Sequence, residues 1–134
     1  MKVYLDSGAF LARYLARDAY HRQALAIWET LRGAPLFTSN HVLDEVWTLL
    51  GRRAGNEFAS ERAANAYSSE ALDIIYSTKD DEIEAVRLFG KYADQRVSFT
   101  DCISFALMRR YRIHTAFTFD EHFRMAGFEI IEVT

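Results

Sequence analysis

The sequence predicts an α/β fold, a three-layer α/β/α sandwich with a mostly parallel central sheet. Short runs rich in β-branched and aromatic residues alternate with helical stretches of about ten residues along the chain. The 134 residues contain no repeat, no low-complexity segment and no dividing linker, and half of them are hydrophobic. We therefore predict a single domain, residues 1–134, with a substantial hydrophobic core.

The first predicted strand is "KVYL", Lys2–Leu5, and the Asp6-Ser7-Gly8 sequence that follows it is a turn signal. A short helix is expected over Phe10–Ala16. Asp18 can cap a longer second helix, which Gly33 ends. The side chains of this helix that we expect to face inward are Leu25, Ile27, Trp28 and Leu31.

A second strand is predicted at Leu36–Thr38, and Ser39-Asn40 then opens a helix. Its apolar residues at helical spacing are Val42, Val46, Leu49 and Leu50. A mixed polar helix from Asn56 to about Tyr67 leads to the third strand, Leu72–Tyr76. We therefore expect the strand–helix alternation to continue through the middle of the chain.

The last part of the chain repeats the alternation. Thr78 and Asp81 have capping-box spacing, and the helix that they open runs through Ile83, Val86 and Phe89 towards Tyr92. The elements predicted after it are a helix headed by Asp101, a strand over Thr115–Phe119, a short helical turn after Asp120, and a last strand over Glu129–Val133.

Composition limits the possible functions. With 19 acidic and 16 basic side chains the net charge is −3, which argues against a simple polyanion binder. Nearly all the positive charge is arginine, however, and arginine suits bidentate phosphate recognition, so nucleic acid stays open as a ligand. No apolar run is long enough to cross a membrane, and "MKVYLDSGAF" lacks the apolar core of a signal peptide. The lone Cys102 has no disulfide partner in the chain, and we expect a cytoplasmic protein.

Four carboxylates stand out against this map. Asp6 and Asp120 follow predicted strands directly, at the carboxyl ends where open α/β sheets bind ligands. Asp101 heads the apolar run "SFTDCISFALM", and Glu45 lies in the helix after "LFTSN". Each has a local explanation: Asp6 as a turn residue, Asp101 as a helix cap, Asp120 as an Asx-turn, and Glu45 with Asp44 as a solvated face.

Together the four acids favour a metal site. Carboxylates that converge on one place raise one another's pKa, and a divalent cation removes this repulsion. Mg²⁺ and Mn²⁺ prefer carboxylate and water ligands. Such a constellation suits metal-assisted hydrolysis of phosphodiester bonds.

Four segments resemble a known family, in the same order and at the same spacing: "VYLDSGAF", "FTSNHVLDEVWTLL", "SFTDCISFALMRRYRI" and "AFTFDEHFRMAGFEII". On these segments the chain is similar to PIN-domain proteins, above all to the VapC-type toxic ribonucleases of bacterial and archaeal toxin–antitoxin pairs. By position, the resemblance implies that Asp6, Asp101 and Asp120 bind a metal ion. Glu45 would complete the acidic set directly or through water.

The same resemblance implies further properties. Ser7 and Thr118 match positions where the family has small hydroxyls that orient a ligand or water, although hydroxyls beside turns also serve as local backbone partners. The implied cofactor is Mg²⁺ or Mn²⁺ and the implied substrate is RNA. The implied partners are a cognate antitoxin protein, which covers or invades the acidic site, and a second copy of the chain in a homodimer.

The other polar and aromatic side chains point less clearly to a function. The four histidines lack metal-ligand spacing, and for His41 and His122 a structural or surface role is favoured. Arginines follow the Glu45 and Asp101 helices; they either complement the helix dipole or contact RNA or a partner. The apolar stripe of Phe10, Leu11, Tyr14 and Leu15 is either core or a partner surface, whereas Phe99, Phe105, Phe117 and Phe119 are expected in the core.

Rival functions fit less well. A phosphoaspartyl enzyme of the haloacid dehalogenase type needs a second Asp two residues after the first, where this chain has Gly8. A receiver domain needs an acidic pair after the first strand and a phosphoacceptor Asp at the end of a central strand, and neither is present. The remaining alternative is a catalytically silent PIN-fold module that binds RNA or protein, which a metal-dependent cleavage assay would distinguish from a nuclease.

Overall fold

A computed structural model of the chain describes residues 1–132, which form five strands and seven helices. Their order is β1 (Val3–Leu5), α1 (Ser7–Tyr14), α2 (His21–Thr30), β2 (Leu36–Ser39), α3 (Asn40–Ala54), α4 (Asn56–Ser68), β3 (Leu72–Ile75), α5 (Lys79–Lys91), α6 (Phe99–Arg110), β4 (Thr115–Phe117), α7 (His122–Met125) and β5 (Glu129–Ile130). The predicted last strand is shorter than expected, and its final residue, Val133, lies outside the described residues.

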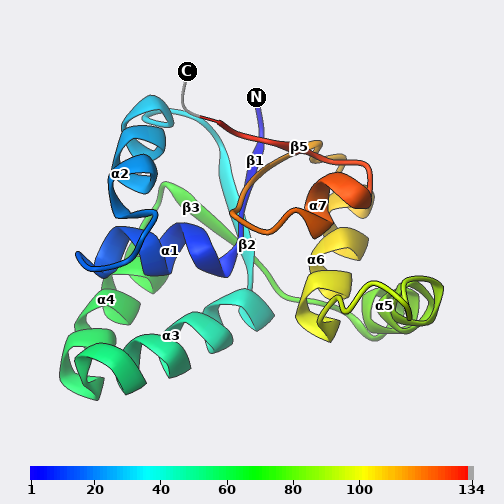
Figure 1. Cartoon of the computed structure of the whole chain (residues 1–134), viewed down its shortest axis with the longest axis horizontal. Helices are drawn as coiled ribbons and strands as arrows, with labels where there is room; N and C mark the ends of the chain where they lie inside the picture. The colour runs from blue at the N-terminus through cyan, green and yellow to red at the C-terminus, as the bar shows by residue number, and fades with distance from the viewer. Residues whose placement is uncertain (133–134) are drawn as a thin grey trace.

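The five strands form one sheet in the order β3-β2-β1-β4-β5, and every neighbouring pair is parallel. Helices α1 to α4 cover one face of the sheet and α5 to α7 cover the other (Figure 1). The structure therefore confirms the predicted three-layer α/β/α sandwich, with a sheet that is parallel throughout the described residues. No helix in residues 1–132 is both long and apolar enough to span a bilayer.

The strand order places a topological switch at the centre of the sheet. From β1 the chain passes to β2 and then β3 on one side, and it then returns to β4 on the other side of β1. Tyr4 in β1 pairs with Phe37 in β2 and with Ala116 in β4. A crevice at the carboxyl ends of the two strands is where ligands bind in open α/β sheets.

Helix α6 is the central helix of the face that carries α5 and α7. Every residue from Asp101 to Met108 is buried, and Cys102 is part of the core. The amphipathic pattern of α6 is correspondingly weak, because the helix is covered on nearly all sides. An acid at the head of this helix is therefore held on a rigid, fully packed element.

Two helix starts differ from the sequence prediction. Helix α1 begins at Ser7 instead of Phe10, so Asp6-Ser7-Gly8 is a helix start and not a turn. The residue at position 8 must be small, since a Cβ on Gly8 would lie 3.3 Å from the ring of Phe119. Asp18 does not cap α2, because the N-cap residue of this helix is Tyr20. The Asp18 carboxylate instead accepts the backbone N–H of Tyr20, in the turn before the helix.

The buried face of α2 differs from expectation, and α5 exposes its regularly spaced apolar residues. Leu25 of α2 is exposed, whereas Ile27 and Leu31 are buried as predicted. On α5 the apolar residues Ile83, Val86 and Phe89 are all exposed, because the side that packs against α6 is formed by Ala85, Leu88 and the capping Asp81. Regular spacing identified these helices, but it did not show which side each of them buries.

Candidate active site

The structure brings the four predicted acids to one cavity of about 390 Å³ at the carboxyl ends of β1 and β4. Asp6 follows β1, Glu45 lies in the second turn of α3, Asp101 lies in the first turn of α6, and Asp120 follows β4. Segments that are far apart in the sequence therefore meet where the strand order reverses. Each of the four reaches the same hollow from a different element.

Asp6 is the most deeply buried of the four, with 5% of its surface exposed. It is the N-cap residue of α1 but makes no side-chain capping bond. Instead, its Oδ2 accepts a 2.6 Å hydrogen bond from the hydroxyl of Thr118. The pKa of Asp6 is raised to about 6, chiefly by burial and also by the nearby Asp120 and Glu45 carboxylates, against the lowering effect of the Thr118 hydroxyl.

Thr118 connects two of the acids. Besides donating to Asp6, its Oγ1 accepts the backbone N–H of Asp120 at 3.0 Å, and the side chain is 2% exposed. Its hydroxyl therefore sets the position of Asp6 relative to Asp120. Ser7, the other hydroxyl predicted from the resemblance, lines the cavity, and its backbone hydrogen bond lowers the pKa of Asp6.

Asp101 belongs to the N-terminal cap of α6 and also lines the acidic cavity. It completes a capping box with Ser98, in the same way that Asp81 completes one with Thr78 at the start of α5. The two acids are similarly buried, but Asp81 is paired with Arg110, whose Nε lies 2.9 Å from its carboxylate. In residues 1–132 no cation pairs with Asp101, and its neighbours are other acids.

Burial and these acidic neighbours set the electrostatics of Asp101. Its pKa is raised to about 7, chiefly by burial and also by the charges of Asp6 and Asp120. Helix capping does not require neighbouring carboxylates, whereas a metal site typically brings several carboxylates close together.

Glu45 and Asp44 are adjacent in α3, but they point in different directions. Glu45 is half-buried and lines the cavity, while Asp44 is exposed to solvent. Burial raises the pKa of Glu45. The geometry therefore agrees with the choice of Glu45 over Asp44, since successive positions on a helix are turned by about 100°.

Two ionisable side chains at the cavity were not predicted as site residues. The first, His122, has a buried Nδ1 that lies 2.9 Å from Asp120 Oδ1 without forming a hydrogen bond, and it has no other hydrogen-bond partner among the described residues. The second, Arg96, lies in the turn before α6. Arg96 lies in a turn and His122 begins the four-residue helix α7. Segments this short have no periodic sequence pattern that could have identified either residue.

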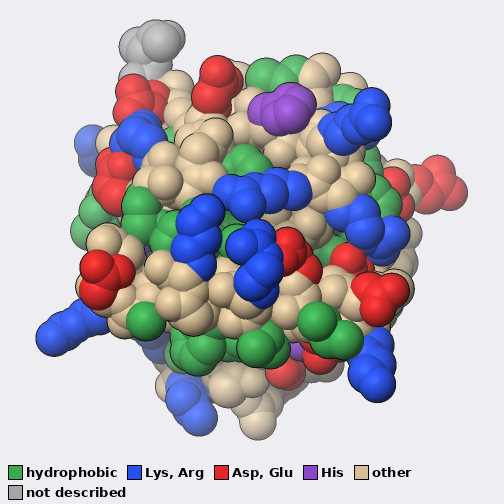
Figure 2. All heavy atoms as spheres, turned by 90° about the vertical axis from the view of Figure 1, so that its right-hand side faces the viewer, with side chains coloured by type: hydrophobic (Ala, Val, Ile, Leu, Met, Phe, Trp, Pro, Cys, Tyr) green, Lys and Arg blue, Asp and Glu red, His purple; other side chains and the backbone are tan. Residues whose placement is uncertain are grey.

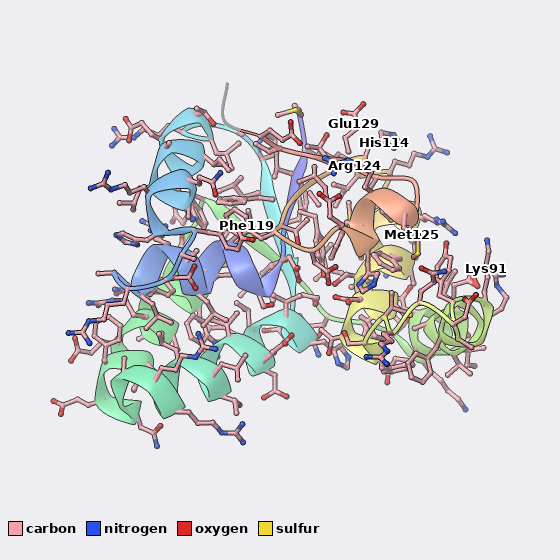
Figure 3. The ribbon with its side chains drawn as sticks, viewed as in Figure 1. Lys91, His114, Phe119, Arg124, Met125 and Glu129 are labelled. Carbon is pink, nitrogen blue, oxygen red and sulfur yellow. The ribbon has the colours of Figure 1, made fainter. Side chains whose placement is uncertain are left out.

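Phe119 packs against the core, as predicted, but it is only partly buried and also faces the cavity. It lines the cavity between Thr118 and Asp120, stacks on the ring of Tyr20 at 4.4 Å, and lies beside the first turn of α1 (Figure 3). The aromatic ring thus forms one wall of the acidic cavity. A larger hollow of about 700 Å³ is lined by residues of α1, α2 and α4, away from the acids.

The donors in this cavity fit a divalent cation. Asp101, Asp120 and His122 can each offer one ligand atom, and these atoms lie within 4.8 Å of one another. The unpartnered Nδ1 of His122 and the crowded, buried carboxylates both lack a compensating group within residues 1–132. A cation would satisfy both, and an oxygen-rich set with one imidazole is compatible with Mg²⁺ or Mn²⁺.

Comparisons with known proteins agree with this geometry. The PIN domain family matches residues 3–129. The chain is 36% identical over 126 residues to the 23S rRNA-specific endonuclease VapC20 of Mycobacterium tuberculosis, which covers 94% of this chain and 95% of that protein. It is 30% identical over 109 residues to a VapC ribonuclease of Archaeoglobus fulgidus, covering 78% of this chain and 68% of the relative.

Solved structures agree as well. The crystal structure of Mycobacterium tuberculosis VapC20, described as a sarcin–ricin loop cleaving toxin, matches with a TM-score of 0.91 at 35% identity over 98% of this chain and 99% of that one. The Rickettsia felis VapBC2 complex bound to a promoter DNA fragment matches in fold, with a TM-score of 0.74 at 13% identity over 98% of each chain. From its sequence, fold and site together, the chain belongs to the PIN-domain family, among its VapC-type members.

Proposed function

We propose that this protein is a Mg²⁺- or Mn²⁺-dependent endoribonuclease that hydrolyses RNA phosphodiester bonds as the toxin of a toxin–antitoxin pair. One observation carries the proposal: four carboxylates from four separate elements line one cavity at the topological switch. Family membership supports it, because the relatives are named as ribonucleases. We place the reaction in the cytoplasm, where an RNA substrate is accessible.

In this proposal Asp6, Asp101 and Asp120 hold the metal ion, and Glu45 completes the set directly or through a water molecule. When bound, the ion supplies Lewis-acid activation of a water molecule and neutralises charge on the scissile phosphate. The chain supplies the geometry: α6 fixes Asp101, while Thr118 keeps Asp6 and Asp120 in register. The exposed side of the cavity admits the RNA strand, and the Phe119 wall closes it towards α1.

The substrate class follows from the most informative relative. The VapC20 endonuclease is named as specific for 23S rRNA and is described as cleaving the sarcin–ricin loop, and it is 36% identical to this chain over 94% of its length. We therefore propose the sarcin–ricin loop of 23S rRNA as the first substrate to test. A synthetic hairpin with this loop should be cut at one position, and a hairpin with the same stem and a scrambled loop should remain intact.

The test of the proposal is cleavage of this RNA with Mn²⁺ or Mg²⁺ by the wild type, Asp6→Ala and Asp101→Asn. We expect cleavage by the wild type alone, and EDTA should abolish it. Asp44→Asn, a change at an exposed acid beside Glu45, should cleave normally. Cleavage that survives both site substitutions, or that ignores EDTA, contradicts the proposal, while RNA binding without any cleavage would favour the catalytically silent module.

The toxin role has its own test. Induced expression of the wild type in a bacterial host should arrest growth, and expression of Asp101→Asn should not. Co-expression with the cognate antitoxin, which we expect to be encoded beside this gene and to cover the acidic cavity, should restore growth. Normal growth of cells that contain the active nuclease would contradict the toxin role without affecting the proposed chemistry.

We further propose a homodimer formed through α5. Hydrophobic side chains lie in a row across this side of the molecule, below a group of basic side chains (Figure 2), and Ile83, Val86 and Phe89 are each about half exposed. An antiparallel pair of α5 helices would bring these stripes together around Val86. It would also bring Asp80 in the first turn near Lys91 in the last turn of the partner helix.

Light scattering coupled to size exclusion tests this arrangement. Val86→Glu should convert a dimer to a monomer, whereas Tyr67→Glu, at an equally exposed apolar residue on α4, should leave the dimer intact. A Val86→Glu protein that stays dimeric would show that the copies meet elsewhere.

A further inference from the structure

Arg96 is the one lysine or arginine among the residues that line the acidic cavity in the described chain. It lies in the turn between α5 and α6, two residues before Ser98, the residue that caps α6 and holds Asp101. Val97 between them is buried, so the backbone of Arg96 is anchored to the core. The position of Arg96 relative to Asp101 is therefore fixed by α6 itself.

The side chain of Arg96 has no partner that explains its presence. Within residues 1–132 it forms no ion pair, although it shares the cavity with four acids. By contrast, Arg110 near the other end of α6 is paired with the buried Asp81. The guanidinium of Arg96 is exposed and stays available to an anion that enters the cavity.

The backbone of Arg96 has a conformation that is unfavourable for arginine. Its φ is +56°, in the left-handed region that disfavours any residue with a Cβ. Glycine has no such penalty and is found at positive φ at Gly33, Gly55 and Gly127 in this chain. Arg112 has the same φ, so the backbone conformation does not by itself assign a role to Arg96; its place in a cavity lined by four acids does.

The chemistry of the cavity indicates what that function is. RNA brings its phosphates towards a cluster of carboxylates, and a metal ion can neutralise only the phosphate that it contacts. A guanidinium at the rim binds a neighbouring phosphate in a bidentate, charge-assisted way. Phosphate contacts of this kind set the register of a strand without selecting its bases.

We propose that Arg96 is a substrate-positioning residue whose guanidinium binds an RNA backbone phosphate next to the scissile one. The inference rests on the proposed ribonuclease function and adds a phosphate-binding residue to it. Arg96 touches no reacting atom in this arrangement, so its loss should affect the binding of RNA more than the chemical step.

The chain supplies a matched control. Arg112 has the same φ of +56° and is likewise exposed, but it follows α6 at the end remote from the cavity and is absent from the cavity lining. Arg112→Ala thus removes the same charge from the same backbone conformation. Arg96→Gly removes the charge and also relieves the strained φ, so it should fold at least as well as the wild type.

The experiment combines kinetics with binding. Arg96→Ala and Arg96→Gly should raise KM for the sarcin–ricin hairpin about tenfold with kcat nearly unchanged, and Arg96→Lys should recover part of the loss. In an Asp101→Asn background without cleavage, fluorescence anisotropy should show weaker RNA binding. Loss of Arg96 should also lower the slope of log affinity against log salt by about 0.7 to 0.9. Arg112→Ala should match the wild type in all three measurements.

Equal affinity and equal salt slope for Arg96→Gly and Arg112→Ala would overturn the assignment of Arg96. A loss confined to kcat would also overturn it, since that result points to the chemical step. These outcomes are distinct from failure of the proposed function, which would appear as a wild type that does not cut RNA or an Asp101→Asn protein that still does.

Discussion

At the scale of single residues, Thr118 shows how one buried hydroxyl can organise two carboxylates from different parts of the chain. Its two hydrogen bonds, to Asp6 and from the Asp120 backbone, both lie beneath the cavity. Thr118→Val keeps the shape of the side chain but leaves the Asp120 N–H without a partner. We expect a loss of about 1–3 kcal/mol in the free energy of unfolding and of about 10- to 100-fold in RNA cleavage.

Thr118→Ser is the matched variant, because it keeps the hydroxyl and loses only a methyl group. Its cleavage rate should stay within a few-fold of the wild type, and chemical denaturation should show a smaller loss of stability than Thr118→Val. If the valine variant cleaves RNA as fast as the serine variant, Thr118 does not position the acids and is only part of the core.

At the scale of elements, α5 and α6 begin with the same device for different purposes. Both have a capping box completed by Asp, but Asp81 is neutralised by Arg110 while Asp101 faces the acidic cavity. Thr78→Ala and Ser98→Ala should each cost about 1 kcal/mol of unfolding free energy. Only Ser98→Ala should also weaken Mn²⁺ binding, by about tenfold, because the Ser98 hydroxyl accepts the backbone N–H of Asp101 and so holds the first turn of α6, which carries the Asp101 carboxylate.

Thermal melts and isothermal titration with Mn²⁺ would check this pair of variants side by side. Equal Mn²⁺ affinities for the two alanine variants would mean that the α6 cap plays no part in metal binding.

The elements also show what the sequence could and could not predict. Alternating strands and helices were recognisable because β-branched runs and helical spacing are local, and so was the capping box of Thr78 and Asp81. The start of α1 at Ser7 was missed because Asp, Ser and Gly are common both in turns and at helix starts, so the local sequence does not separate the two. The spacing of apolar residues on α5 likewise did not show that Val86 is exposed, since the packing partner decides which side of a helix is buried.

At the scale of the whole molecule, the site depends on strand order, which no local pattern contains. Asp6 and Asp120 could be placed at strand ends from sequence, but only the pairing of β1 with β4 makes those ends neighbours. Arg96 joins them from the turn before α6, and His122 joins them from the start of α7. The four acids could be predicted as a set because the family resemblance links their positions. That Arg96 lies at the same cavity is shown only by the three-dimensional structure.

The assembled acids give the whole protein a predictable dependence on pH. The pKa of Asp6 is raised to about 6 and that of Asp101 to about 7, so the folded, metal-free protein holds protons that the unfolded chain releases near pH 4. Stability from this source is fully present below pH 4 and is lost as the pH rises to about 7. Mn²⁺ replaces the protons, so it should raise the melting temperature more at pH 7.5 than at pH 5.

Asp101→Asn separates this effect from general changes in stability. It removes the charge and keeps an acceptor for the Ser98 N–H. Without metal at pH 7.5 it should melt a few degrees above the wild type, which corresponds to about 1 kcal/mol or more, and the difference should vanish near pH 4. Asp44→Asn, at an exposed acid outside the cavity, should follow the wild type throughout. A wild type whose melting temperature is constant from pH 5 to 7.5, and equal to that of Asp101→Asn, would show that the four acids do not repel one another in the folded protein.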